Sequence, residues 1–113
     1  MEIASDTHGG IWLTVFTVDL LLRFDPSAGT FTSYYVPSPR KEKGGLYGLL
    51  ITPSNDVWVT MLAENTLAHL DVAADRFTSY HIPMKESGPF GVVMGMDQTL
   101  WFTARDKIGM LGP

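Results

Sequence analysis

The chain has 113 residues, 45% of them hydrophobic, with a formal net charge of −4 and an isoelectric point near 5.1. This composition predicts one folded domain with one core, and its acidic balance argues against nucleic acid as a partner. The absence of cysteine excludes disulfides, thiolate nucleophiles and cysteine-ligated zinc. Residues 1–10 show no signal-peptide pattern and no apolar run reaches the length of a membrane span, so we expect no membrane partner and, by default, a cytoplasmic location.

In chain order, short segments with strand character alternate with turns. Residues 20–25 (LLLRFD) are followed by the turn sequence PSAG, and residues 30–36 (TFTSYYV) alternate until Pro37. Residues 48–52 (GLLIT) form an apolar run that the turn sequence PSND ends, and residues 57–60 (VWVT) are β-branched and aromatic. The pattern predicts an all-β fold with about four strands in every 40–50 residues.

Two sequence features recur at a fixed spacing. The pattern FTSY-x-[IV]-P occurs at 31–37 and again, 46 residues later, at 77–83. A Trp-x-Thr triplet starts at Trp12, Trp58 and Trp101, with spacings of 46 and 43 residues. Self-similarity at this period indicates a repeat protein in which each repeat contributes one structural unit.

Residues 61–75 (MLAENTLAHLDVAAD) are the segment in which helix propensity competes with the strand pattern. The repeat decides in favour of a strand. A leucine follows Trp58 by nine residues, as another follows Trp12, and the first copy of this window contains a proline and a glycine that disfavour a helix. We therefore predict a strand at 66–71.

The repeat resembles the blades of the virginiamycin B lyase, or streptogramin lyase, family of β-propellers, which have about seven blades. The resemblance is carried by GPFGVVMGMDQTLWFTARDKIGML at 88–111, LYGLLITPSNDVWVT at 46–60 and LLLRFDPSAGTFTSYYVP at 20–37. Regulatory propellers of two-component sensors carry a related blade and are the group most easily confused with this family. The resemblance implies a C-terminal portion of about two and three-quarter blades. This partial propeller would comprise blade 1 at about 1–37, blade 2 at about 46–83 and an incomplete blade 3 at about 88–113.

The family fold implies four antiparallel strands per blade, named A to D from the central channel outwards. Strand A is expected at 46–52 and 90–96, with residues 1–5 as the tail of the first strand A, and strand B is expected at 10–16, 57–61 and 99–104. Strand C is expected at 20–25, 66–71 and 107–111. Strand D is expected at 30–36 and 76–82. FTSY is then the outermost strand of a blade. Phe31 and Ser33 are expected on one of its faces, and Thr32 and Tyr34 on the other. Blade 3 lacks strand D, which the N-terminus of the chain supplies in the family.

The resemblance also implies where family chemistry would reside. Active members open the streptogramin B lactone by elimination, with a histidine base just before strand A, a glutamate directly after WFT and a bound Mg²⁺. The base position is Phe90 here, and Tyr47 one blade earlier. The residues that follow the three Trp-x-Thr triplets are Val15, Met61 and Ala104. None supplies a base or an oxygen ligand for Mg²⁺, so we predict no catalytic, cofactor-binding or metal-binding residue.

The remaining candidate polar residues are scattered. His8 is expected in a turn, His69 in a strand C and His81 in a strand D, which favours surface or inter-blade positions over metal ligation. Glu64 and Asn65 fall in the loop between strands B and C. A solvated loop is favoured there over a metal site, because one carboxylate rarely holds Mg²⁺ alone.

The aromatic residues that recur with the period are predicted to form the structural core of the repeat. This set comprises Trp12, Trp58, Trp101, Phe31 and Phe77. Their shared phase favours packing between repeats over stacking on a ligand.

Two classes of function remain. The favoured one is a non-catalytic propeller module for folding, assembly or binding, and the alternative is a streptogramin B lyase that is active only within a complete propeller. A partial propeller leaves blade faces uncovered and leaves the edge of strand 107–111 unpaired. We therefore expect a homo-oligomer that forms through these surfaces, most simply a dimer with about six blades.

Overall fold

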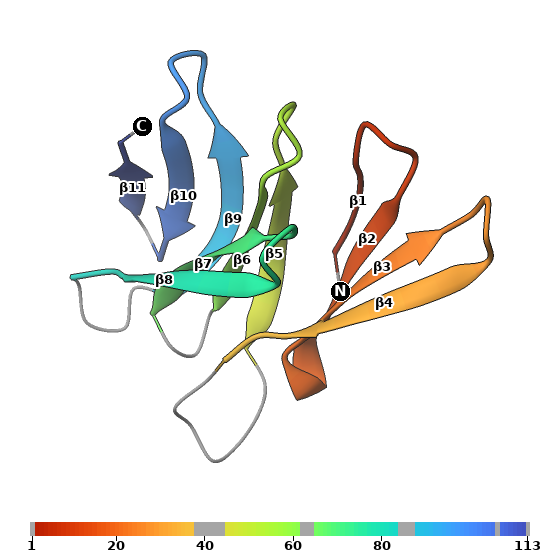
Figure 1. Ribbon diagram of the computed structural model, residues 1–113. Helices are drawn as coiled ribbons and strands as arrows, with labels where there is room; N and C mark the ends of the chain where they lie inside the picture. Colours follow the sequence, from red (N-terminus) through yellow and green to blue (C-terminus); the bar gives the residue numbers. More distant parts are fainter. Residues whose placement is uncertain (1, 38–44, 62–64, 84–87, 106, 113) are drawn as a thin grey trace.

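The computed structural model describes residues 2–37, 45–61, 65–83, 88–105 and 107–112, and these contain eleven strands, one 3-10 turn and no α-helix (Figure 1). The strands form three antiparallel sheets, so the fold is all-β as predicted. The first sheet has the order β1 (Ile3–Ser5), β2 (Ile11–Val15), β3 (Leu20–Asp25) and β4 (Thr30–Tyr35), with the turn η1 (Phe16–Val18) after β2. The second has the order β5 (Leu46–Ile51), β6 (Val57–Met61), β7 (Thr66–Asp71) and β8 (Arg76–His81). The third contains β9 (Pro89–Met94), β10 (Leu100–Ala104) and β11 (Lys107–Leu111), with β10 in the middle.

The segment with competing helix propensity is a strand, as the repeat predicts. In β7, Leu67 pairs with Thr60 of β6, just as Leu21 of β3 pairs with Thr14 of β2. Propensity is a weak prior, and here the pairing with both neighbouring strands overrides it. The short turn η1 is the one described element that the sequence did not predict.

The tight turns repeat in geometry even where the residue types differ. One residue in each turn between the first two strands of a sheet has a left-handed backbone, namely Gly9 (φ 84°), Asn55 (φ 67°) and Gln98 (φ 65°). Glycine and asparagine adopt this conformation readily, whereas glutamine does so less often. The backbone conformation of this turn therefore recurs in all three sheets, even where the residue type changes.

The three sheets, which we call blades 1, 2 and 3, pack face to face. The core between blades 1 and 2 comprises Trp12, Leu21, Val36, Leu46, Val57, Val59, Met61, Ala68 and Leu70. The core between blades 2 and 3 comprises Leu67, Ile82, Val92, Phe102 and Ala104. The innermost strand β5 contacts both β1 and β9, so the inner strands of the blades lie next to one another. Among the described residues, no helix is long and apolar enough to cross a membrane.

The predicted structural core is only partly buried. Trp12 is 2% exposed, Trp58 is half-buried, and the half-buried Phe77 packs against the core between blades 1 and 2. The prediction of burial is wrong for Trp101, which is 39% exposed, and for Phe31, which is 62% exposed. Trp101 lies on the face of blade 3 that points away from blade 2, and Phe31 lies on the face of blade 1 that points away from blade 2. Among the three described sheets, none covers either side chain.

Candidate functional site

The positions of the family base are occupied by a row of aromatic rings. Tyr47, near the start of β5, stacks on Phe90, near the start of β9, with 3.9 Å between ring centroids and 29° between ring planes. Phe16 of η1 meets the Tyr47 ring edge-on at 6.3 Å. Phe90 is 45% exposed and Phe16 is 39% exposed. This aromatic row offers solvent a flat, mostly apolar surface and no imidazole.

The positions of the family glutamate carry apolar side chains. Met61 and Ala104 are each 2% exposed, and Val15 is half-buried. Mg²⁺ binds oxygen ligands, which these three side chains lack, so they do not fit the metal that active family members hold. Within the described ranges, no group of three or more His, Cys, Asp or Glu side chains could share a metal ion.

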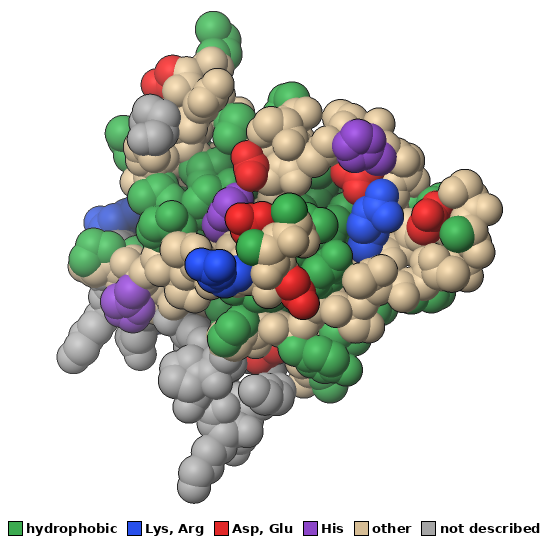
Figure 2. All heavy atoms as spheres, in the orientation of Figure 1, with side chains coloured by type: hydrophobic (Ala, Val, Ile, Leu, Met, Phe, Trp, Pro, Cys, Tyr) green, Lys and Arg blue, Asp and Glu red, His purple; other side chains and the backbone are tan. Residues whose placement is uncertain are grey.

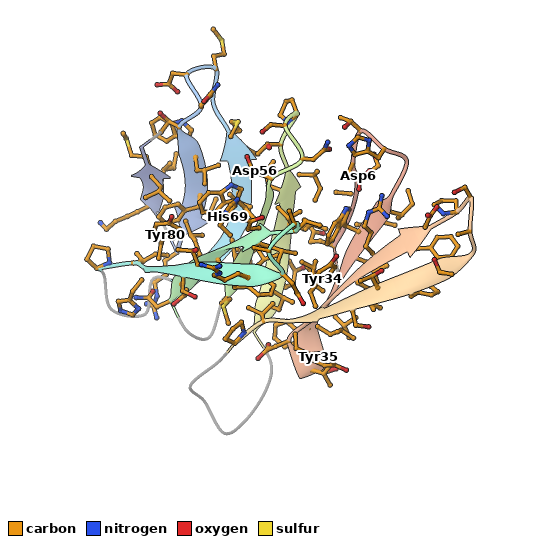
Figure 3. All side chains as sticks on the ribbon, in the orientation of Figure 1. Asp6, Tyr34, Tyr35, Asp56, His69 and Tyr80 are labelled. Carbon is orange, nitrogen blue, oxygen red and sulfur yellow. The ribbon has the colours of Figure 1, made fainter. Side chains whose placement is uncertain are left out.

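A groove of about 800 Å³ separates blades 2 and 3 beside β11. Its wall includes Trp58, Tyr80, Asp56 and Leu111. The space-filling view shows hydrophobic side chains gathered over this part of the molecule, and Figure 3 shows Tyr80 and Asp56 at its border (Figures 2 and 3). Sequence reasoning did not predict the groove, although a third blade without an FTSY strand was the signal that could have found it.

His69 contacts two residues of the groove wall, Asp56 and Trp58, both in blade 2. Its Nε2 lies 3.0 Å from Oδ1 of Asp56, and its ring lies 4.8 Å from the Trp58 ring. The Trp58 ring in turn lies 5.6 Å from the Tyr80 ring. Its place in β7 agrees with the strand C that the sequence predicted for this histidine.

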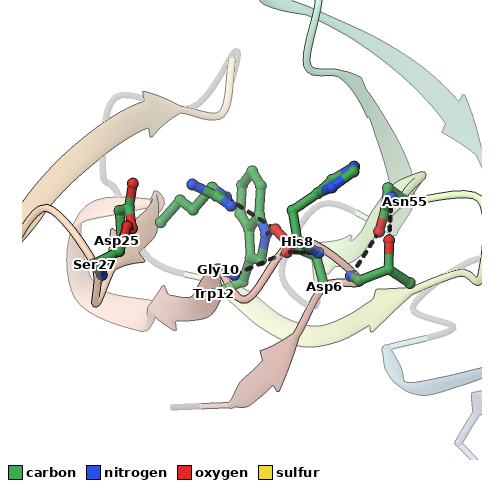
Figure 4. Close-up of polar contacts among 9 residues, drawn as sticks. Asp6, His8, Gly10, Trp12, Asp25, Ser27 and Asn55 are labelled. Carbon is green, nitrogen blue, oxygen red and sulfur yellow. Dashed lines mark hydrogen bonds and ion pairs between the residues drawn. The ribbon is translucent and has the colours of Figure 1, made fainter.

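The corresponding place in blade 1 holds a tighter polar cluster (Figure 4). Oδ2 of Asp6 accepts hydrogen bonds from Nε1 of Trp12 at 2.8 Å and from Nε of Arg23 at 2.9 Å. Its Oδ1 accepts the backbone N–H groups of His8 and Gly10. Burial alone would raise the pKa of Asp6, but the bonds from Arg23, Trp12 and the backbone outweigh it and hold that pKa well below its usual range. The cluster stabilises the turn and carries no free acid or base.

The other candidate residues have structural contacts or lie apart. His8 occupies the exposed turn between β1 and β2, and His81 ends β8 at an exposed position. Asn65 has a left-handed backbone, and its Nδ2 donates to the carbonyl of Ile82 at 2.8 Å. Glu64 lies outside the described residues. Asn65 thus lies beside the end of β8, where His81 is the last residue, while His8 lies in blade 1.

Three antiparallel sheets with adjacent inner strands, each packed on the next through an apolar core, define part of a β-propeller. The chain belongs to the virginiamycin B lyase family, whose sequence model matches residues 1–112. Among curated proteins, none matches the chain.

Solved structures agree with this assignment. The chain is similar to a streptogramin B lyase structure, with 29% identity, a TM-score of 0.86 and coverage of 97% of this chain and 36% of that one. It is also similar to virginiamycin B lyase from Staphylococcus aureus, with 22% identity, a TM-score of 0.82 and coverage of 98% and 40%. A catalytically inactive histidine-to-alanine variant of the S. aureus lyase with quinupristin gives 22% identity, a TM-score of 0.80 and the same coverage. The chain thus spans about two-fifths or less of the length of these lyases.

Proposed function

We propose that this chain is a non-catalytic β-propeller module that acts by assembling with further blades. The observation that carries the proposal is the Tyr47–Phe90 stack at the family base position, together with buried Met61 and Ala104 at the glutamate positions. An elimination needs a base within reach of the proton it removes. Neither a phenyl ring nor a thioether can take that proton.

The test is incubation of the purified chain with quinupristin, with and without Mg²⁺, followed by mass spectrometry for the linearised product. We expect no product above the no-protein control, while S. aureus virginiamycin B lyase in parallel shows that the assay works. A Phe90→Ala variant is the matched control, because any trace activity that survives this change does not come from the base position. Product formed by the unmodified chain alone would refute the non-catalytic proposal.

The alternative is a streptogramin B lyase whose base and metal ligands come from blades outside residues 1–113. The 29% identity to a streptogramin B lyase structure, of which this chain covers 36%, favours it. The two proposals differ in one measurement. A longer protein that contains residues 1–113 and converts quinupristin, while the isolated chain does not, supports the alternative.

We also propose that the isolated chain forms a homo-oligomer through its uncovered blade faces and the free edge of β11. In β11, Ile108 is 73% exposed and Met110 is 61% exposed, and the strand pairs only with β10 among the described strands. Unpaired edges and exposed apolar faces are common features of interfaces. Light scattering after size exclusion should give at least twice the monomer mass at tens of micromolar, and a monomer mass there would refute the proposal.

A further inference from the structure

A threonine hydroxyl joins each blade to the next. Oγ1 of Thr14 in blade 1 donates to the carbonyl of Tyr47 in blade 2 at 3.0 Å and accepts the backbone N–H of Glu2 at 3.0 Å. Oγ1 of Thr60 in blade 2 donates to the carbonyl of Phe90 in blade 3 at 2.9 Å and accepts the N–H of Gly48 at 2.6 Å. Both threonines are fully buried. Thr14 and Thr60 therefore each bridge the inner strand of their own blade and the inner strand of the following blade.

Thr103 is the third member of this series and makes half of the bridge. Its Oγ1 accepts the N–H of Gly91 within blade 3 at 2.9 Å. Unlike the two buried threonines, it is exposed, and no carbonyl of a further blade lies beside it within the described part of the chain. The donor side of its hydroxyl therefore faces solvent.

The space beside two equivalent glycines, Gly48 and Gly91, also indicates that a further blade could pack on blade 3. A Cβ on Gly48 would overlap the carbonyl oxygen of Phe90, so the close approach of the next blade requires glycine there. A Cβ on Gly91 would meet only Oγ1 of Thr103, at 3.7 Å. The space that a carbonyl fills beside Gly48 is thus open beside Gly91.

The rest of this surface is apolar. We define the C-terminal face as the outward face of blade 3, formed by Gly91, Val93, Trp101, Thr103, Ile108 and Met110. It contains a hollow of about 240 Å³ that is lined by Gly91, Val93, Trp101, Thr103 and Ile108 among others. Trp101 is 39% exposed, whereas Trp12 at the same repeat position is 2% exposed beneath blade 2. Burial of the same kind would require a further blade.

Blade 1 carries the complementary surface on its outward side. Blade 2 covers Trp12 with Val57, Val59 and Leu70 of the core and with Phe77, which packs against it. The residues 46 positions earlier are Ile11, Leu13, Phe24 and Phe31, all apolar. We define these four, together with Ile3, as the N-terminal face. Phe31 is 62% exposed, Ile3 is 72% exposed, and the rings of Phe24 and Phe31 lie 4.8 Å apart.

We infer that the C-terminal face of one copy binds the N-terminal face of a second copy, with Thr103 and Gly91 as the docking point. The inference rests on the assembly part of the proposed function. The contact repeats the two interfaces already present within the chain. In each of them, the face of one blade that carries the Trp and Thr side chains of the triplet packs on the opposite face of the next blade. By the repeat, the hydroxyl of Thr103 donates to a backbone carbonyl of the innermost strand on the N-terminal face of the second copy. Two such head-to-tail contacts close a ring of two chains.

Gly91→Ala tests the inference, because its Cβ has room in the isolated chain and none beneath a docked carbonyl. Sedimentation velocity across a concentration series should show that Gly91→Ala raises the dimer Kd at least about tenfold and that Thr103→Val raises it about tenfold. Thr32→Val, an exposed threonine of β4 outside both defined faces, should leave the Kd unchanged. Circular dichroism and the urea midpoint of the diluted monomer should match the parent for Gly91→Ala.

The outcomes separate this inference from the broader proposal. A dimer with the same Kd in the parent and in Gly91→Ala overturns the docking point and leaves assembly through another surface, such as the β11 edge. A parent chain that is monomeric at tens of micromolar overturns both. Loss of the dimer in Gly91→Ala with unchanged monomer stability supports head-to-tail docking of a second copy.

Discussion

Removal of the Thr60 hydroxyl tests whether the inter-blade bridge stabilises the fold. Thr60→Val keeps the side-chain shape and leaves the Gly48 N–H and the Phe90 carbonyl without their bonds of 2.6 and 2.9 Å. A buried polar group without a partner costs about 1–3 kcal/mol, so two such groups should cost about 2–6 kcal/mol in free energy of unfolding. For a small domain of about 5–15 kcal/mol, this is a large fraction of the total.

The assay is urea unfolding followed by fluorescence, at a concentration low enough that the chain is monomeric. With a slope of about 2 kcal/mol per molar, the midpoint of Thr60→Val should fall by about 1–3 M. Thr103→Val is the matched control, because it breaks one bond at an exposed site and should shift the midpoint by less than about 0.3 M. Equal midpoints for Thr60→Val and Thr103→Val would show that the bridge contributes nothing.

The other predictions concern burial and charge. Trp12→Ala should cost roughly 3–5 kcal/mol in urea unfolding, and Trp101→Ala should cost less than half of that, since only Trp12 is fully buried. Equal costs would contradict the burial difference. Asp6→Asn should destabilise the chain at pH 7, and the difference from the parent should shrink as the pH falls below about 4. Because the folded pKa of Asp6 is lowered, its stabilisation exists above the unfolded pKa and is lost in acid. Thermal unfolding from pH 7 to pH 3 checks this, and a constant difference would refute it. Acrylamide quenching of Trp101, in a Trp12→Phe/Trp58→Phe background, should weaken as protein concentration rises, and quenching independent of concentration would contradict burial of the C-terminal face.

The strand positions could be predicted because the repeat fixes them several times over. Segment 66–71 is a strand although its own residues favour a helix, and its equivalent at 20–25 gave the decisive constraint. Burial could not be predicted in the same way. The phase of the repeat places Trp101 and Phe31 on blade faces, but whether a face is covered depends on the presence of another blade. For that reason the prediction holds for Trp12 and fails for Trp101 and Phe31.

The polar clusters were harder to foresee because they depend on pairs that do not repeat. Asp6 and Arg23 pair across blade 1, whereas the equivalent positions in blade 2 hold Thr52 and His69. A comparison of repeats therefore does not reveal this cluster, because its residues occur in blade 1 and not in blade 2. The threonine bridge left a clearer signal, since Thr14 and Thr60 both stand in the Trp-x-Thr triplet. The sequence shows the donor, but the acceptor is a backbone carbonyl in another blade, which only the folded chain brings into contact.

The bridge also explains how the side chain at the family base position can differ while the family fold is kept. The residues at the base position, Tyr47 and Phe90, are anchored through their backbone carbonyls by Thr14 and Thr60 of the preceding blades. Their side chains take no part in that anchor and stack on each other instead. Replacement of imidazole by a phenol or phenyl ring at this position therefore leaves the inter-blade hydrogen bond intact. Fold and chemistry share the same residue but use different atoms of it, so the side chain can change without loss of the propeller.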